Sequence, residues 1–117
     1  MFPMGKMKMP ETSSAGNCFY KDKRLMLSYE IVENPSGKGR KRHIICNFKN
    51  FYNGKPFKCD IVLDEPDMDT LVIATPWNKK HAFYYNQKIN CMRALGEVQF
   101  DDKIYRFNPQ TDFGTLD

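Results

Sequence analysis

The residues best suited to chemistry lie at 75–77 and 83–92, where four aromatic side chains, several amides and a lysine share a short span. Rings supply stacking surface and amides supply hydrogen bonds, a combination typical of ligand sites. If Tyr84 to Asn90 forms a strand, alternate side chains share one face. We therefore predict a ligand-binding face that consists of Trp77, Tyr84, Asn86, Lys88 and Asn90. Phe83, Tyr85 and Ile89 then lie on the other face as core or lipid-like contacts. The alternative is that all these aromatic side chains simply fill the core.

Metal and thiol chemistry find little support in the sequence. The two histidines, His43 and His81, have no second histidine or carboxylate at metal-ligand spacing, so we predict neither a metal nor a cofactor. The four cysteines form no CxxC pair and are too few for a disulfide scaffold. Cys46 and Cys59 sit in alternating strand patterns, which favours small core residues with free thiols and a cytoplasmic location.

Nucleic-acid binding is a separate hypothesis that depends on one basic cluster. Lys38 to His43 reads Lys-Gly-Arg-Lys-Arg-His, and aromatic side chains occur on the neighbouring predicted strands. Positive charge beside stacking surface is typical of single-strand binding grooves. A solvated basic hairpin loop explains the cluster without a ligand and is preferred, since the sequence contains no RNA-recognition signature.

The elements that position these residues are predicted to be almost entirely strands. Apolar residues alternate with polar ones along Leu25 to Ile31, along Ile44 to Phe48, and along Phe57 to Leu63. This period of two indicates sheets with one buried face. Asn53-Gly54 predicts a tight hairpin between the second and third of these strands, because both residues accept positive φ. Residues 33–39 read as a loop.

The second half of the chain predicts further short strands. Leu71 to Ala74 is a continuous apolar run, typical of a strand buried on both faces, and Pro76 ends it. Tyr84 to Asn90 and Ala94 to Phe100 follow as candidate strands, and Asp101 to Lys103 turns the chain into a last strand at 104–107. We expect any helix to be short. Seven or eight strands with short turns predict an all-β antiparallel meander that curls into a barrel or sandwich.

Several segments also carry a family resemblance. They are Thr75-Pro76-Trp77, the run from Phe83 to Met92, Gly96-Glu97-Val98, and the closing Phe113-Gly114-Thr115-Leu116-Asp117. Together they resemble a family of bacterial proteins called domain of unknown function 2804, which is distantly akin to lipocalin-like carotenoid hydratases. In that family the closing segment continues into a Trp-Gly-rich stretch. The resemblance therefore implies that this chain is an internal fragment of a longer protein, and that its fold is the lipocalin-like barrel or half-barrel.

The resemblance implies two functions. Lipocalin-like barrels enclose apolar molecules, so the first expectation is binding of a hydrophobic small molecule such as a lipid or isoprenoid. The second is hydratase or cyclase chemistry on a hydrophobic polyene, which needs a proton donor in an apolar cavity. Asp117, Asp112 and Tyr85 are the candidate donors, although a surface turn explains Asp112 better. No catalytic residue is assigned, and binding without catalysis is the preferred interpretation.

Composition and organisation complete the predictions. An aromatic content of 14% with 27% charged residues indicates a globular domain. Residues 1–17 are predicted to be an extended linker, and residues 18–117 a single β domain truncated at its C-terminus. No apolar run is long enough for a membrane span. Expected partners are the hydrophobic molecule, the remainder of the parent chain, and a second copy paired through an exposed edge strand.

Overall fold

The computed structural model describes residues 17–33 and 39–117, and these are all strands, turns and connections. The predicted linker, except Asn17, and most of the predicted loop at 33–39 lie outside the described residues. Eight strands are present: β1 (Cys18–Lys21), β2 (Leu25–Glu33), β3 (Arg40–Tyr52), β4 (Lys55–Asp64), β5 (Leu71–Pro76), β6 (Phe83–Phe100), β7 (Lys103–Phe107) and β8 (Phe113–Leu116).

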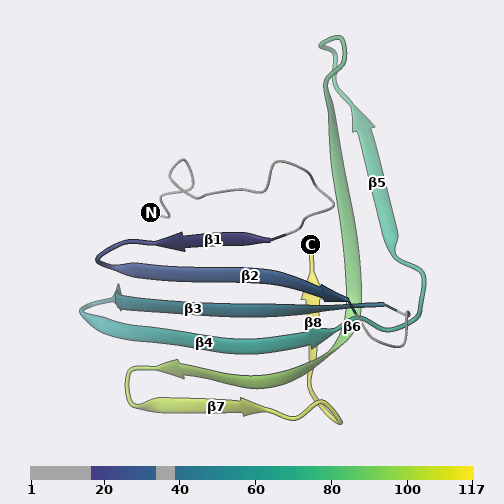
Figure 1. The fold of residues 1–117 in the computed structure, drawn as a ribbon. Coiled ribbons are helices and arrows are strands. Elements are labelled where there is room, and N and C mark those ends of the chain that lie inside the picture. Colours follow the sequence, from purple (N-terminus) through teal and green to yellow (C-terminus); the bar gives the residue numbers. More distant parts are fainter. Residues whose placement is uncertain (1–16, 34–38) are drawn as a thin grey trace.

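The strands form one antiparallel sheet in the order β1-β2-β3-β4-β6-β5, and β7 and β8 also pair with β6. Consecutive strands are neighbours up to β4, as in a meander. The prediction of an all-β antiparallel fold is confirmed, but the sheet does not close into a barrel. In Figure 1 the axes of β1 to β4, of the second half of β6 and of β7 are roughly aligned. The axes of β5, of the first half of β6 and of β8 cross them.

The long strand β6 produces this change of direction. Its first half pairs with β5 and its second half with β4 and β7. Between them the pairing with β8 shifts by one residue, because Ile89 faces Leu116 while Met92 faces Gly114. Cys91 has φ 57° at this shift, so it marks a β-bulge with one extra residue on β6. The sequence predicted two separate strands here. The structure has one bent strand with a bulge in it, which the sequence analysis did not predict.

The Asn53-Gly54 hairpin is confirmed. Both residues have positive φ, 49° and 77°, as a type I′ turn requires. The Gly54 amide donates a hydrogen bond to the Asn50 side-chain oxygen at 2.9 Å. The turn joins β3 to β4, whose pairing shifts register between Tyr52 and Phe48 and is regular from Phe48 to Lys41.

The prediction that Leu71 to Ala74 is buried on both faces is wrong. Every residue of β5 is exposed, including Leu71 at 57% and Val72 at 50%. β5 is the last strand in the sheet order, and its only strand partner among the described residues is the first half of β6. The apolar run therefore forms an edge strand. It belongs to an extended hairpin of β5 and the first half of β6, and we call this hairpin the arm (residues 71–88).

The core lies where β6 bends. Ile89, Met92, Ala94 and Leu63 are buried together, and Ile44, Ile61, Phe107 and Leu116 pack against them. Met92 is completely buried and Ile89 is 2% exposed. β8 lies close over β4 at this point, since a Cβ on Gly114 would be 2.6 Å from Leu63 Cδ2. We call this region the corner.

Candidate ligand-binding face

One face of the sheet is apolar across six strands, and we call it the inner face because it carries Met92 and Ala94. Its side chains stand in cross-strand rows set by the register. One row consists of Tyr20, Leu27, Cys46, Cys59 and Val98, and the next consists of Leu25, Phe48, Phe57 and Phe100. These residues are buried or half-buried. The opposite, outer face carries mostly polar residues, such as Asn47, Lys58 and Glu97.

The bulge at Cys91 keeps this apolar surface continuous around the bend. Residues 89 and 92 are three apart and would point to opposite sides of a regular strand. The extra residue in the bulge brings Ile89 and Met92 to the same side of β6. Phe83 and Tyr85 share that side with Ile89, since they differ from it by even numbers of residues. The inner face of the arm therefore continues directly into the corner. Without the bulge, Phe83 and Tyr85 would face away from the core.

A buried ion pair lies at the corner end of the inner face. Arg42 Nη1 donates a hydrogen bond to Glu65 Oε2 at 2.8 Å, and the two side chains are only 5% and 15% exposed. Nη1 also lies 3.7 Å from the sulfur of Met92. Arg42 Nε is buried with no hydrogen-bond partner. The pair is thus an electrically balanced polar group inside an otherwise apolar region.

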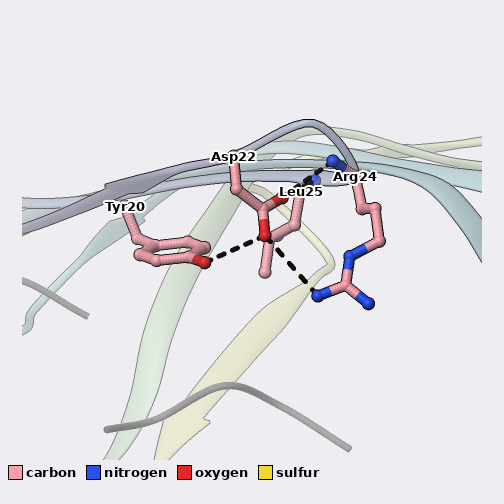
Figure 2. Close-up of polar contacts among 4 residues, drawn as sticks. All are labelled: Tyr20, Asp22, Arg24 and Leu25. Carbon is pink, nitrogen blue, oxygen red and sulfur yellow. Dashed lines mark hydrogen bonds and ion pairs between the residues drawn. The ribbon is translucent and has the colours of Figure 1, made fainter. Parts of the chain in front are cut away.

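A polar clasp lies at the β1–β2 turn, where it holds two buried inner-face residues, Tyr20 and Leu25 (Figure 2). The Tyr20 hydroxyl donates to Asp22 Oδ2 at 2.9 Å, and Asp22 Oδ1 accepts from the Arg24 and Leu25 amides at 2.7 and 2.9 Å. The Arg24 amide and the Tyr20 hydroxyl lower the pKa of Asp22, whereas the carboxylate raises the pKa of Tyr20. Asp22 is therefore ionised at neutral pH, and it fixes Tyr20 at the rim of the inner face.

Aromatic rings close the inner face at the end near the Asn53-Gly54 turn. Phe51 lies 4.9 Å from Phe57 and 6.2 Å from Phe100, measured between ring centroids. Phe48 lies 5.5 Å from Phe51 and 6.1 Å from Phe57. Most of these contacts are edge-on, the geometry that the ring quadrupoles favour. The inner face thus runs from this aromatic cluster to the ion pair at the corner.

The binding residues predicted from the sequence are partly brought together, but on the outer face. Asn86 Nδ2 donates to the Tyr84 hydroxyl oxygen at 2.5 Å and to Asp117 Oδ1 at 2.8 Å, and Lys88 Nζ contacts Asp117 Oδ2. Asn90 is exposed beside the bulge, and Trp77 is 60% exposed just past the end of β5. Tyr84, Asn86 and Lys88 therefore form one polar network with Asp117. The ligand-binding role given to the five residues stays a prediction.

The candidate proton donors lie apart from one another. Lys88 and Asn86 lower the pKa of Asp117, so this carboxyl is ionised at neutral pH and has no proton to donate. Asp112 caps its own turn, because its Oδ2 accepts the Asn108 amide at 2.7 Å. Tyr85 lies on the inner face of the arm and is 56% exposed. These three candidate donors therefore do not form one site in the structure.

The basic cluster at 40–43 is part of a strand, and the interpretation of a solvated loop is wrong for Arg42. Three of its side chains face carboxylates of β4 or of the residue after it. Lys41 Nζ lies 3.6 Å from Asp64, and His43 Nε2 lies 2.7 Å from Asp60. These contacts offset much of the positive charge that suggested nucleic acid. Lys38 lies outside the described residues.

Other site types find little geometric support. A groove of about 200 Å³ lies against β2, β3, β4 and β6, with Asn47, Lys58 and Gln99 in its lining. Within residues 17–33 and 39–117, no three histidine, cysteine or acidic side chains cluster as metal ligands would. The same part of the chain contains no helix that is long and apolar enough to cross a membrane.

Comparison with known proteins identifies the family. The family model described as domain of unknown function DUF2804 matches residues 1–117. The chain belongs to the DUF2804 family. No curated protein and no solved structure matches this DUF2804 chain significantly. The family resemblance seen in the sequence is confirmed, and the family description itself assigns no activity.

Sequence reasoning missed several residues that shape the inner face. Arg42 shares its parity with Ile44 and Cys46, so the period-two pattern already placed it inward, but its charge suggested solvent. Asp22 precedes Leu25 by three residues, a spacing at which an aspartate caps a turn. Glu65 had no such signal. Its partnership with Arg42 depends on the β3–β4 register, which only the fold provides.

Proposed function

We propose that this DUF2804 domain binds a hydrophobic small molecule, such as a lipid or isoprenoid, on its inner face. The observation that carries the proposal is the continuity of the apolar surface across the Cys91 bulge. The arm contributes exposed inner-face groups, among them Val72 at 50%, Phe83 at 62% and Tyr85 at 56%. Contiguous apolar surface of this kind marks a binding surface on a folded protein.

The two ends of the inner face give the ligand site its shape. Apolar contact provides about 25 cal/mol per Å² of surface removed from water, without directional preference. The aromatic cluster of Phe48, Phe51, Phe57 and Phe100 bounds one end. The Arg42–Glu65 pair bounds the other with a net charge of zero. These features support a mainly apolar, elongated ligand better than a highly charged one.

Two adjacent tyrosines allow a matched test. Tyr85 points to the inner face and Tyr84 to the outer face of the same strand, with exposed fractions of 56% and 44%. We expect Tyr85→Ser to weaken binding of a fluorescent long-chain polyene carboxylate by roughly 10-fold, because an aromatic contact is lost. Tyr84→Ser should change the dissociation constant by less than about 2-fold. Titration monitored by probe fluorescence and by quenching of Trp77, the sole tryptophan, gives both constants.

Binding on the outer face is the second candidate, favoured by the polar network of Tyr84, Asn86, Lys88 and Asp117. It corresponds to the face predicted from the sequence and would place a polar ligand group against Lys88. It predicts the opposite result, in which Tyr84→Ser weakens binding and Tyr85→Ser does not. If neither variant changes binding, both placements of the ligand are wrong.

Catalysis and nucleic-acid binding have less support. A hydratase or cyclase needs a protonated acid next to the polyene, and Asp117 is ionised on the outer face. Lys41, Arg42 and His43 of β3 each lie against a carboxylate. A discriminating nucleic-acid test should use Arg40→Glu rather than a change of Arg42, which is buried. Salt-sensitive oligonucleotide binding that Arg40→Glu abolishes would revive that hypothesis.

Pairing of two copies through β5 is a further proposal from the sheet order. β5 ends that order, and its residues Leu71 to Ala74 carry no charge, the features of an edge strand that can accept another strand. Ile73→Lys should then shift the protein toward monomer in sedimentation velocity. A monomeric wild-type protein at all concentrations would contradict this pairing.

A further inference from the structure

Two of the four cysteines face each other across neighbouring strands. Cys46 on β3 and Cys59 on β4 are direct cross-strand partners. Such partners have Cα atoms about 4.5–5.5 Å apart, depending on their place in the ladder. A disulfide accepts Cα separations of about 4.4–6.8 Å, so directly opposed cross-strand positions are compatible with the bond. The other two cysteines differ, since Cys18 faces Tyr29 and Cys91 lies in the bulge.

The two thiols interact and are not equivalent. The neighbouring Cys46 thiol lowers the pKa of Cys59, and the neighbouring Cys59 thiol raises the pKa of Cys46. Cys59 is half-buried, whereas Cys46 is 8% exposed. The Cys59 sulfur also lies 3.9 Å from the Ile44 carbonyl oxygen. Cys59 is therefore the more accessible sulfur and the better nucleophile, and Cys46 is positioned to resolve what forms on it.

We propose that Cys46 and Cys59 form a reversible disulfide within the chain when the protein meets a peroxide. In the first step the Cys59 thiolate attacks one peroxide oxygen, the O–O bond breaks, and a sulfenic acid forms with loss of hydroxide. In the second step the Cys46 sulfur attacks the Cys59 sulfur, the S–O bond breaks, and the second oxygen leaves as water with the Cys46 proton. Two thiols lose two electrons in total, and hydrogen peroxide becomes two waters.

This modification requires no ligand, although both cysteines lie on the inner face that is proposed to bind one. The disulfide would link β3 to β4 in the middle of the inner face, in the row that also contains Leu27 and Val98. It would close the hairpin turned by Asn53-Gly54 and constrain the unfolded chain, which raises the melting temperature. An excess of dithiothreitol would reverse it by thiol–disulfide exchange.

The experiment treats the reduced wild-type protein with hydrogen peroxide at dilute concentration, then blocks and counts thiols and maps peptides by mass spectrometry. We expect the Cys46 and Cys59 peptides to become linked with a mass loss of about 2 Da, the two hydrogens removed. The monomer should persist, its melting temperature should rise, and dithiothreitol should restore both. Circular dichroism before and after oxidation checks that the fold is retained.

Variants separate this linkage from oxidation elsewhere. Cys18→Ser with Cys91→Ser retains the pair and should oxidise as the wild type does. In that background Cys46→Ser should stop at a Cys59 sulfenic acid, which dimedone traps. A linkage confined to Cys91 of two copies would overturn the proposal, as would oxidation of Cys59 to sulfinic acid while Cys46 stays reduced. The peptide map of the oxidised wild-type protein requires no substitution, so it tests the proposal even if a variant fails to fold.

Discussion

The corner and the arm use the same strand and similar side chains, yet they differ completely in burial. Ile89 and Met92 in the corner are 2% and 0% exposed, whereas Phe83 and Tyr85, a few residues earlier on the same face of β6, are 62% and 56% exposed. In the corner β8 pairs with β6 and packs over Leu63 of β4, whereas within the arm β5 is the strand that pairs with β6 among the described residues. Burial here depends on a second layer of strands, and apolar composition alone does not provide one.

The comparison assigns different roles to the two regions. Apolar contacts in the corner stabilise the fold, because exposing these side chains to water on unfolding costs free energy. The apolar groups of the arm contribute little to folding and remain available to a ligand or to another strand. Substitutions that are chemically equal should therefore affect stability in the corner and binding on the arm.

The largest effect on stability is expected from breaking the buried ion pair. Glu65→Ala leaves the Arg42 guanidinium buried without its carboxylate, which should reduce the free energy of unfolding by about 3–5 kcal/mol. The control is Asp64→Ala, which breaks the half-exposed Lys41–Asp64 contact and should cost about 0–1 kcal/mol. Urea unfolding of both variants measures the difference.

Replacing both partners tests whether the pair is needed for stability at all. The double variant Arg42→Met, Glu65→Leu should recover most of the loss, since well-packed apolar residues often replace a buried pair without penalty. Recovery would also show that the cost in Glu65→Ala comes from the unpaired charge. An equal cost for Asp64→Ala and Glu65→Ala would mean that the corner is more solvated than its burial indicates.

The next largest effect compares two isoleucines. Ile89→Ala should lower the free energy of unfolding by about 2–5 kcal/mol, because it opens a cavity among Leu63, Met92 and Ala94. Ile73→Ala on the arm, where the side chain is 37% exposed, should cost less than about 1 kcal/mol. Thermal and urea unfolding give both values. Similar losses at the two positions would indicate that the arm is covered in solution.

A smaller effect comes from backbone strain far from both regions. Gly54 has φ 77°, and a Cβ on this residue would meet no other atom within 4 Å, so a substitution there changes conformation without changing packing. Gly54→Val should cost about 1–3 kcal/mol through a β-branched residue at positive φ. Gly54→Asn is the control, since asparagine tolerates this region and should cost less. Calorimetry of the two variants separates strain from the packing losses of the corner.

Local sequence patterns predicted the strands well because each pattern depends on neighbouring residues only. The alternation in β2, β3 and β4 and the positive-φ demand of Asn53-Gly54 are local, and the structure confirms them. The all-β class followed from the same patterns. The burial of Leu71 to Ala74 was wrong because it depends on what lies above and below β5, which no local pattern records.

The candidate site was harder to predict because it depends on one extra residue. The sequence placed Tyr84, Asn86 and Lys88 on one face correctly, and the network with Asp117 follows from that register. The bulge at Cys91 decides which of the two faces continues into the core. Cys91 has a positive φ, but it is not a glycine, so the sequence did not mark the position of the bulge. The partnership of Arg42 with Glu65 likewise needed the three-dimensional register of β3 and β4.

The smallest effect concerns the link between the two regions. Lys88 on the arm contacts Asp117, which follows β8, and this contact with that of Asn86 lowers the Asp117 pKa below its ordinary value of 3.8. Because the folded-state pKa is depressed, the contribution to stability is present above the ordinary value and is lost as pH falls through the lowered one. The groups are exposed, so salt should weaken the effect.

Carbon-13 NMR titration of the Asp117 carboxyl measures this link directly. Lys88→Met should return the pKa toward its ordinary value, and Asn86→Ala should raise it less, since Lys88 is the larger cause. Hydrogen exchange of the β5 amides should become faster in Lys88→Met while exchange in the corner stays unchanged, because the arm would lose its tie to β8. Faster exchange at Ile89 and Met92 as well would mean that arm and corner open as one unit, and the distinction between them would fail.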